Sequence, residues 1–160
     1  MTAVRDAGVA PATGPELLIT RTFDAPRELV WKAWTDPEHA RHWWGPTGFT
    51  APEIELATRP GERWRAVMVA PDGRRYPQHG VMREIVPPER LVYTFVWSER
   101  PEHEMLVSVT FEERGGKTEM TFRQTGFLTE VERDDHRGGW GETFDRLELA
   151  LRESGMGNGE

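Results

Sequence analysis

Alternating apolar and polar positions dominate the middle of the chain and predict β-strands. Between residues 50 and 125, apolar side chains recur at every second position, and turns rich in Gly and Pro separate the runs. A period of two is typical of strands because successive side chains point to opposite faces of a sheet. With the alternating segment 17–23, the pattern predicts a seven-stranded, mostly antiparallel sheet. The six later strands are expected at Thr50–Thr58, Glu62–Ala70, Arg74–Val86, Leu91–Ser98, Glu104–Glu113 and Thr118–Thr125.

Each predicted strand has one apolar face. In one of them Trp64, Ala66 and Met68 share a face, whereas Arg63 and Arg65 lie on the other. An antiparallel sheet of this kind exposes one face to water and needs a cover for the other. A helical element elsewhere in the chain must therefore pack against the apolar face.

Helical spacing first appears after the first strand and predicts two short helices. The segment Asp24-Ala25-Pro26 supplies a capping residue and a proline suited to a first helical turn, and the helix is expected from about 26 to 34. Asp36-Pro37 begins a second helix, whose apolar face is expected to hold Ala40, Trp43 and Trp44 before Gly45-Pro46 ends it.

A long C-terminal helix is the predicted cover. Thr129-x-x-Glu132 has the spacing of a capping box, in which each side chain satisfies a free backbone donor. Large apolar residues then recur at helical spacing, and their burial would contribute about 6–12 kcal/mol before entropy is counted. They are Trp140, Phe144, Leu147 and Leu151.

Three glycines, Gly138, Gly139 and Gly141, interrupt this helix. Each costs roughly 1 kcal/mol relative to alanine in a helix interior. Two interpretations stay open. The glycines either kink the helix or delay its start to Gly139, or their missing side chains let the backbone approach the sheet beside Trp140.

The two ends of the chain lack periodicity. Residues 1–15 are rich in Ala, Gly, Pro and Thr and predict a disordered leader, and residues 154–160 predict a flexible tail. Residues 16–153 are then one α+β domain, which agrees with a length of 160 residues.

Composition excludes several function classes. The chain has no cysteine, so disulfides, thiol nucleophiles and thiolate metal sites are ruled out. No apolar run is long enough for a membrane span or a secretory signal, and a cytoplasmic location is expected. A net charge of −7 disfavours nucleic-acid binding. A homodimer stays open, because the pattern leaves some of the tryptophans unplaced.

Catalytic and metal-binding motifs are weak. Asp36, His39 and His42 have helical spacing but no third histidine nearby, so no metal site is expected. No nucleophile motif, phosphate loop or cofactor motif is present. Acid–base catalysis by a histidine or glutamate is harder to exclude, and its candidates are His79, Glu84 and Tyr93.

The aromatic residues favour a binding cavity. The chain has seven Trp and seven Phe, and ligand cavities are mainly apolar with a few orienting polar groups. Gln78 and His79 are the expected polar groups. The other predicted cavity residues, at the mouth and along the walls, are Trp43, Trp44, Phe49, Trp64, Met68, Tyr93, Phe95, Phe122, Trp140 and Phe144.

The order of one strand, two short helices, six strands and a long helix is that of the helix-grip, or START-like, fold. Over about residues 16–153 the chain resembles the Hsp90 ATPase activator homologue 1-like domains of that superfamily. The motifs that carry the resemblance are Asp24–Trp31, Asp36–His39 with Trp43–Pro46, Pro71–Gly73, Glu84–Thr94, and Gly139-Trp140 followed by Phe144 and Leu147.

The resemblance implies a curved sheet wrapped around the C-terminal helix, with a hydrophobic cavity between them, but no particular ligand. Bacterial members of this family are mostly stand-alone domains. The leading hypothesis is non-enzymatic binding of a small hydrophobic or aromatic molecule. One alternative is a hydrolase or cyclase that uses a cavity His or Glu. The other is a co-chaperone-like interaction domain, which has only weak support. The eukaryotic co-chaperones contact Hsp90 through a separate N-terminal region, and no such region is expected here.

Overall fold

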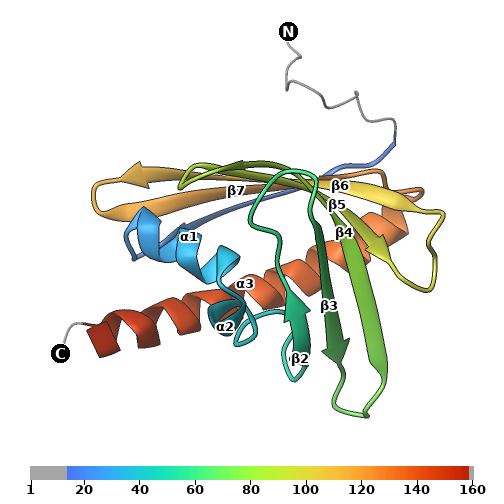
Figure 1. Ribbon diagram of the computed structural model, residues 1–160, viewed down its shortest axis with the longest axis horizontal. Coiled ribbons are helices and arrows are strands. Elements are labelled where there is room, and N and C mark those ends of the chain that lie inside the picture. The colour runs from blue at the N-terminus through green and yellow to red at the C-terminus, as the bar shows by residue number, and fades with distance from the viewer. Residues whose placement is uncertain (1–13, 159–160) are drawn as a thin grey trace, which may run out of the picture.

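The fold is a seven-stranded antiparallel sheet that curves over one long helix (Figure 1). The computed structural model describes residues 14–158. Strand order is β1-β7-β6-β5-β4-β3-β2, so every neighbour except the β1–β7 pair is consecutive in sequence. The strands are β1 Leu17–Phe23, β2 Thr50–Glu55, β3 Arg63–Val69, β4 Arg75–Val86, β5 Arg90–Trp97, β6 Glu104–Arg114 and β7 Lys117–Thr125.

Turn chemistry and strand irregularities shape the sheet. Gly115 and Gly116 join β6 to β7 with φ angles of 60° and 86°, which suits the two-residue hairpin turn expected at a Gly-Gly pair. The pairing of β4 with β5 shifts register between Met82 and Glu84. Such a bulge increases local twist and bends the strand, which helps the sheet to curve around the helix.

The two short helices are α1, Arg27–Thr35, and α2, Pro37–Ala40. Asp36 caps α2 as expected, since its carboxylate accepts a hydrogen bond from the Glu38 N–H at 2.9 Å. The expected cap by Asp24 is wrong, because Pro26 is the N-cap residue of α1 and no side chain bonds to its first turn. Trp43 and Trp44 were expected inside the second helix but follow its end, in the adjoining turn.

The cover is α3, Glu130–Asn158. One of the two bonds of the predicted capping box is present, because the Thr129 hydroxyl accepts from the Glu132 N–H at 3.1 Å. The other is replaced, because the Glu132 carboxylate accepts from the Leu128 N–H at 2.9 Å. The four apolar residues expected to face the sheet are all buried. Residues 1–13 of the predicted leader lie outside the described residues, and α3 extends past the domain boundary expected at residue 153.

The glycines of α3 neither delay the helix nor bring it against the sheet. The helix already begins at Glu130, before all three. A Cβ placed on Gly138 or Gly141 would meet nothing within 4 Å, and one on Gly139 would meet only Pro46 Cγ at 3.9 Å. The start at Gly139 and the close backbone approach are therefore wrong, whereas the kink stays a prediction. The glycines leave open space at their Cβ positions.

A different glycine permits a close approach inside the sheet. The Trp64 indole on β3 reaches across β4 and donates to the carbonyl oxygen of Thr94 on β5 at 2.9 Å. A Cβ on Gly80 would lie 1.9 Å from that oxygen and 2.5 Å from the indole nitrogen. Only glycine can occupy this position while the bond across β4 is made.

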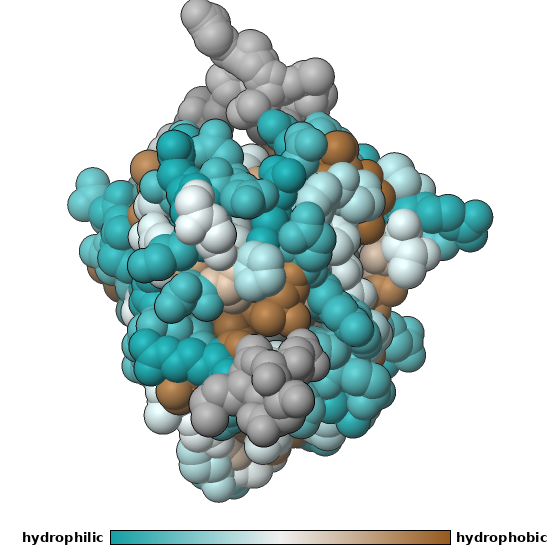
Figure 2. Space-filling view, turned by 90° about the vertical axis from the view of Figure 1, so that its left-hand side faces the viewer, coloured by the Kyte–Doolittle hydropathy of each residue, from teal (hydrophilic) through white to brown (hydrophobic). Residues whose placement is uncertain are grey.

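The core fills the space between the concave face of the sheet and the helices. It is rich in aromatic side chains, and the Trp34 ring contacts Trp43 with a centroid distance of 5.0 Å and Phe144 with 6.1 Å. On the side of α1 and the C-terminal end of α3, the surface is mainly hydrophilic, with one apolar area near its centre (Figure 2). No helix of the described residues is long and apolar enough to cross a membrane.

Candidate ligand-binding cavity

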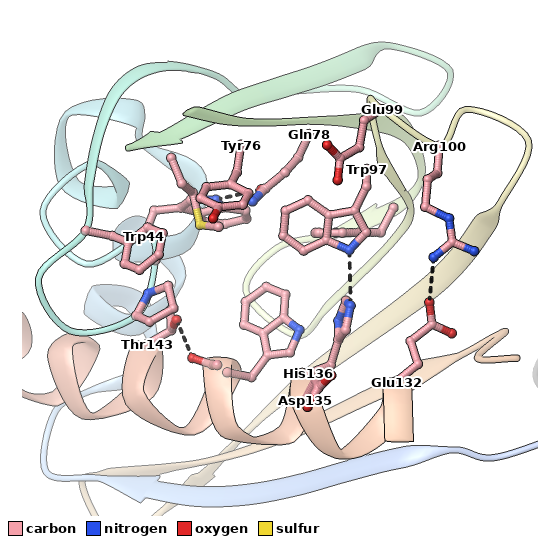
Figure 3. A pocket seen from close by; sticks show the side chains of 17 residues that line it. Trp44, Tyr76, Gln78, Trp97, Glu99, Arg100, Glu132, Asp135, His136 and Thr143 are labelled. Carbon is pink, nitrogen blue, oxygen red and sulfur yellow. Dashed lines mark hydrogen bonds and ion pairs between the residues drawn. The ribbon is translucent and has the colours of Figure 1, made fainter. Parts of the chain in front are cut away.

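A cavity of about 470 Å³ lies between the sheet and α3 (Figure 3). Strands β3, β4 and β5 provide one wall through Met68, Tyr76, Gln78, Phe95 and Trp97. The segment after β5 contributes Glu99 and Arg100, and the segment after α2 closes one end with Trp44, Gly45, Pro46 and Phe49. Segments that are far apart in the sequence therefore line the same cavity.

The opposite wall is a single face of α3. Its lining residues are spaced by three and four positions, as expected for one side of a helix. Gly139 lies in the middle of this face and, having no side chain, leaves part of the space open. The lining residues of α3 are Glu132, Asp135, His136, Gly139, Trp140 and Thr143.

Six of the seventeen lining residues are Trp, Tyr or Phe. Phe95 packs edge-on against Trp97 with a centroid distance of 5.2 Å, and Trp44 packs edge-on against Trp140 at 5.9 Å. Such contacts hold the rings in defined orientations and favour planar apolar guests. Phe49 and Tyr76, at a centroid distance of 5.9 Å, extend this aromatic lining on the side of β4.

Two glutamines hold the tryptophans of this site in place. The Trp44 indole donates to Gln78 Oε1 at 3.0 Å, and the Trp140 indole donates to Gln124 Oε1 at 2.9 Å. An indole N–H only donates, so its partner atom must be the amide oxygen, and the orientation of both amides follows. Gln124 is fully buried behind the cavity, whereas Gln78 lines it.

His136 is the titratable group most changed by this environment. Burial is the main cause, and it lowers the pKa of His136 to about 4 despite the opposing effect of Glu132 and Asp135. The imidazole is therefore neutral at pH 7. Its Nε2 accepts a hydrogen bond from the Trp97 indole at 3.1 Å, which leaves the remaining proton on Nδ1.

Charged residues gather at one end of the cavity. Glu132 lies 3.7 Å from Arg100 across this end, measured between Oε2 and Nη1. Glu99 and Asp135 bring two further carboxylates to the lining, so three acidic side chains face one basic side chain. The charged side chains that line this end are therefore mainly acidic, whereas those that line the aromatic end are uncharged.

The chain matches a known protein family over most of its length. Residues 24–152 match the family model for Activator of Hsp90 ATPase homolog 1-like protein. The chain belongs to this family. A comparison with curated proteins gave no match.

Solved structures share the fold of this family member. The AHSA1 protein of Silicibacter pomeroyi is 25% identical, with a TM-score of 0.80 over 88% of this chain and 99% of that one. A protein of Nitrosomonas europaea is 27% identical, with a TM-score of 0.76 over 87% and 95%. A protein of Chromobacterium violaceum is 23% identical, with a TM-score of 0.78 over 85% and 96%. The predicted helix-grip fold is confirmed.

Six of the twelve predicted cavity residues line the cavity of this family member: Trp44, Phe49, Met68, Gln78, Phe95 and Trp140. The other six do not: Trp43, Trp64, His79, Tyr93, Phe122 and Phe144. Five of these six are buried in the core behind the lining. His79 follows Gln78 on the same strand, and its Nδ1 lies 2.8 Å from Ser98 Oγ, away from the cavity.

Several lining residues were missed by the sequence reasoning. Tyr76 has the same parity as Gln78 on β4, and Trp97 has the same parity as Phe95 on β5, so strand alternation could have identified both. His136 precedes Trp140 by one helical turn. Its position inside the cavity follows from helical spacing once the helix is known to begin at Glu130.

The acid–base candidates named from the sequence lie away from the cavity. Glu84 pairs with Arg90 at 3.2 Å between Oε1 and Nε. Complete burial raises the pKa of Tyr93, which keeps its phenol neutral. In the described part of the chain no three His, Asp or Glu residues gather closely enough to hold a metal ion.

Proposed function

We propose that this protein binds a small aromatic molecule in the cavity between the sheet and α3. The observation that carries the proposal is the unfilled cavity of about 470 Å³ with six aromatic side chains in its lining. Ligand sites are clefts or cavities of about 300–1,000 Å³. A space of this size inside a small domain is what a binding protein needs.

The chemistry of the lining favours binding over catalysis. Catalysis by a cavity histidine would require a basic nitrogen that can take a proton from a substrate. Nε2 of His136 already accepts from Trp97, and burial lowers the pKa of His136 to about 4. An imidazole with these properties is a weak base, and it serves better as a neutral polar group beside a guest.

The proposal is tested with the neutral fluorescent probe N-phenyl-1-naphthylamine. Its emission rises on transfer from water to an apolar site, so a titration gives a dissociation constant. The blocking variant is Gly139→Leu, which places a side chain in the cavity and improves helix propensity. Binding should weaken by about tenfold or more, because a leucine added to a filled space costs about 1–3 kcal/mol.

The matched control is Gly138→Leu. It makes the same change one residue earlier, where the added Cβ would meet nothing within 4 Å and where the position is exposed. This variant should bind the probe like the wild type. Absence of saturable probe binding to the wild type, or equal binding by all three proteins, would refute the proposal.

A further inference from the structure

Gln78 presents an unpaired hydrogen-bond donor to the cavity. Its side chain is 2% exposed and lines the cavity, and its Oε1 accepts from Trp44. The two N–H groups on Nε2 then have no acceptor among residues 14–154 of the chain. Nε2 is not enclosed on all sides, so the open cavity reaches it. This donor is placed where a guest would supply the missing acceptor.

The second glutamine of the site provides a contrast. Gln124 makes the same bond to a tryptophan, but its Nε2 is directed to the Met105 sulfur at 3.5 Å, and it lies outside the cavity. The sequence therefore uses the Gln–Trp pair twice, and only the pair at the cavity keeps its donor group free for a ligand.

His136 adds a second donor on the opposite wall. Because Nε2 accepts from Trp97, the proton is on Nδ1, which has no acceptor in the described part of the chain. Figure 3 shows Gln78 on the side of the sheet and His136 on the side of α3, with the aromatic rings between and around them. Gln78 and His136 thus each supply a donor, from opposite walls of the cavity.

The charged end limits what kind of acceptor can enter. Three carboxylates line it against the single guanidinium of Arg100, and Glu132 already pairs with that group. A ligand with its own negative charge would be repelled there. A carbonyl oxygen accepts hydrogen bonds without carrying a charge.

We infer that the ligand is a planar aromatic molecule that carries a carbonyl oxygen and no negative charge, and that the amide N–H groups of Gln78 bind that oxygen. This inference rests on the proposed function and adds the chemical class of the ligand. It makes Gln78 the residue that selects a ketone, aldehyde or amide over a hydrocarbon of the same shape.

The test compares three probes of nearly equal size: 2-acetylnaphthalene, 2-ethylnaphthalene and 2-naphthoate. Their dissociation constants are measured by displacement of N-phenyl-1-naphthylamine. Wild-type protein should prefer the acetyl compound to the ethyl compound by about tenfold or more, since the hydrocarbon leaves Gln78 unpaired. The carboxylate should bind more weakly than the ketone.

Variants assign the preference to one side chain. In Gln78→Met the two neutral probes should bind with affinities within about twofold, because the donor is gone. Gln78→Glu keeps an acceptor for Trp44 but removes the amide donors, so it should lose the preference too, even if the methionine variant folds poorly. Gln124→Met is the control, since it breaks the same kind of bond to Trp140 but removes no group that lines the cavity, so both neutral probes should be affected equally and the preference for the ketone should persist.

The outcomes separate this inference from the proposed function. Equal wild-type affinities for the ketone and the hydrocarbon would overturn the inference while leaving the binding function intact. A preference that survives both Gln78 variants would also overturn it. If the wild type did not bind even the fluorescent probe, both the inference and the proposed function would be refuted.

Discussion

His136 should make the stability of this protein depend on pH. In the folded state burial lowers its pKa to about 4, from an ordinary value of 6.5. Between these two values the unfolded chain binds a proton that the folded protein does not. By linkage, the free energy of unfolding then falls as the pH falls through this window.

The magnitude follows from the size of the shift. Each pKa unit corresponds to 1.36 kcal/mol, so the complete effect is about 3 kcal/mol. As the pH falls, most of this loss of stability has occurred by pH 4. Lowering the pH from 7 to 5 should remove about 2 kcal/mol of stability through this residue alone. That is a large part of the stability of a small domain.

The assay is urea unfolding at pH 7 and pH 5, followed by tryptophan fluorescence and circular dichroism. The variant His136→Gln removes the titration and keeps an acceptor for the Trp97 indole. Between pH 7 and pH 5, the free energy of unfolding of this variant should fall by about 2 kcal/mol less than that of the wild type. His42→Gln, which removes an exposed histidine, is the control, and its free energy of unfolding should fall by as much as that of the wild type. Equal pH dependence in wild type and His136→Gln would refute the reasoning.

Two further predictions concern glycines with opposite roles. Gly80→Ala should destabilise the fold by more than about 4 kcal/mol or prevent folding, because the new Cβ would lie 1.9 Å from the Thr94 oxygen; thermal melting or soluble yield reports this. Gly138→Ala should raise the free energy of unfolding by about 0.5–1 kcal/mol, since this exposed helical position contacts nothing within 4 Å. A neutral Gly80→Ala or a destabilised Gly138→Ala would contradict the packing described for α3 and the sheet.

The sequence predicted the elements well because their signals are local. Strand alternation and the Thr129–Glu132 cap each depend on residues close together in the chain, and both are present in the structure. The cap shows the limit of such detail, since Glu132 bonds to the N–H of Leu128 and not to that of Thr129.

The cavity was predicted less completely, because the local sequence pattern does not show which part of a strand's apolar face lines the cavity. Tyr93, Phe95 and Trp97 share one face of β5, yet only the last two line the cavity. The Trp64 ring lies 5.4 Å from the Tyr93 ring and covers it, and this contact joins residues from different strands. Alternation identifies the face, but only the packing of the neighbouring elements decides which part of that face stays open.

The bond from Trp64 across Gly80 also has an evolutionary consequence. Because the Thr94 carbonyl group alone leaves no room for a Cβ at position 80, that position should stay glycine within a lineage, whatever residue occupies position 64. Trp64 also packs against Trp44 with a centroid distance of 5.8 Å, and Trp44 forms part of the cavity wall. An exchange at position 64 would therefore reshape the cavity without altering any residue that lines it, which offers descendants of this protein a route to new ligands.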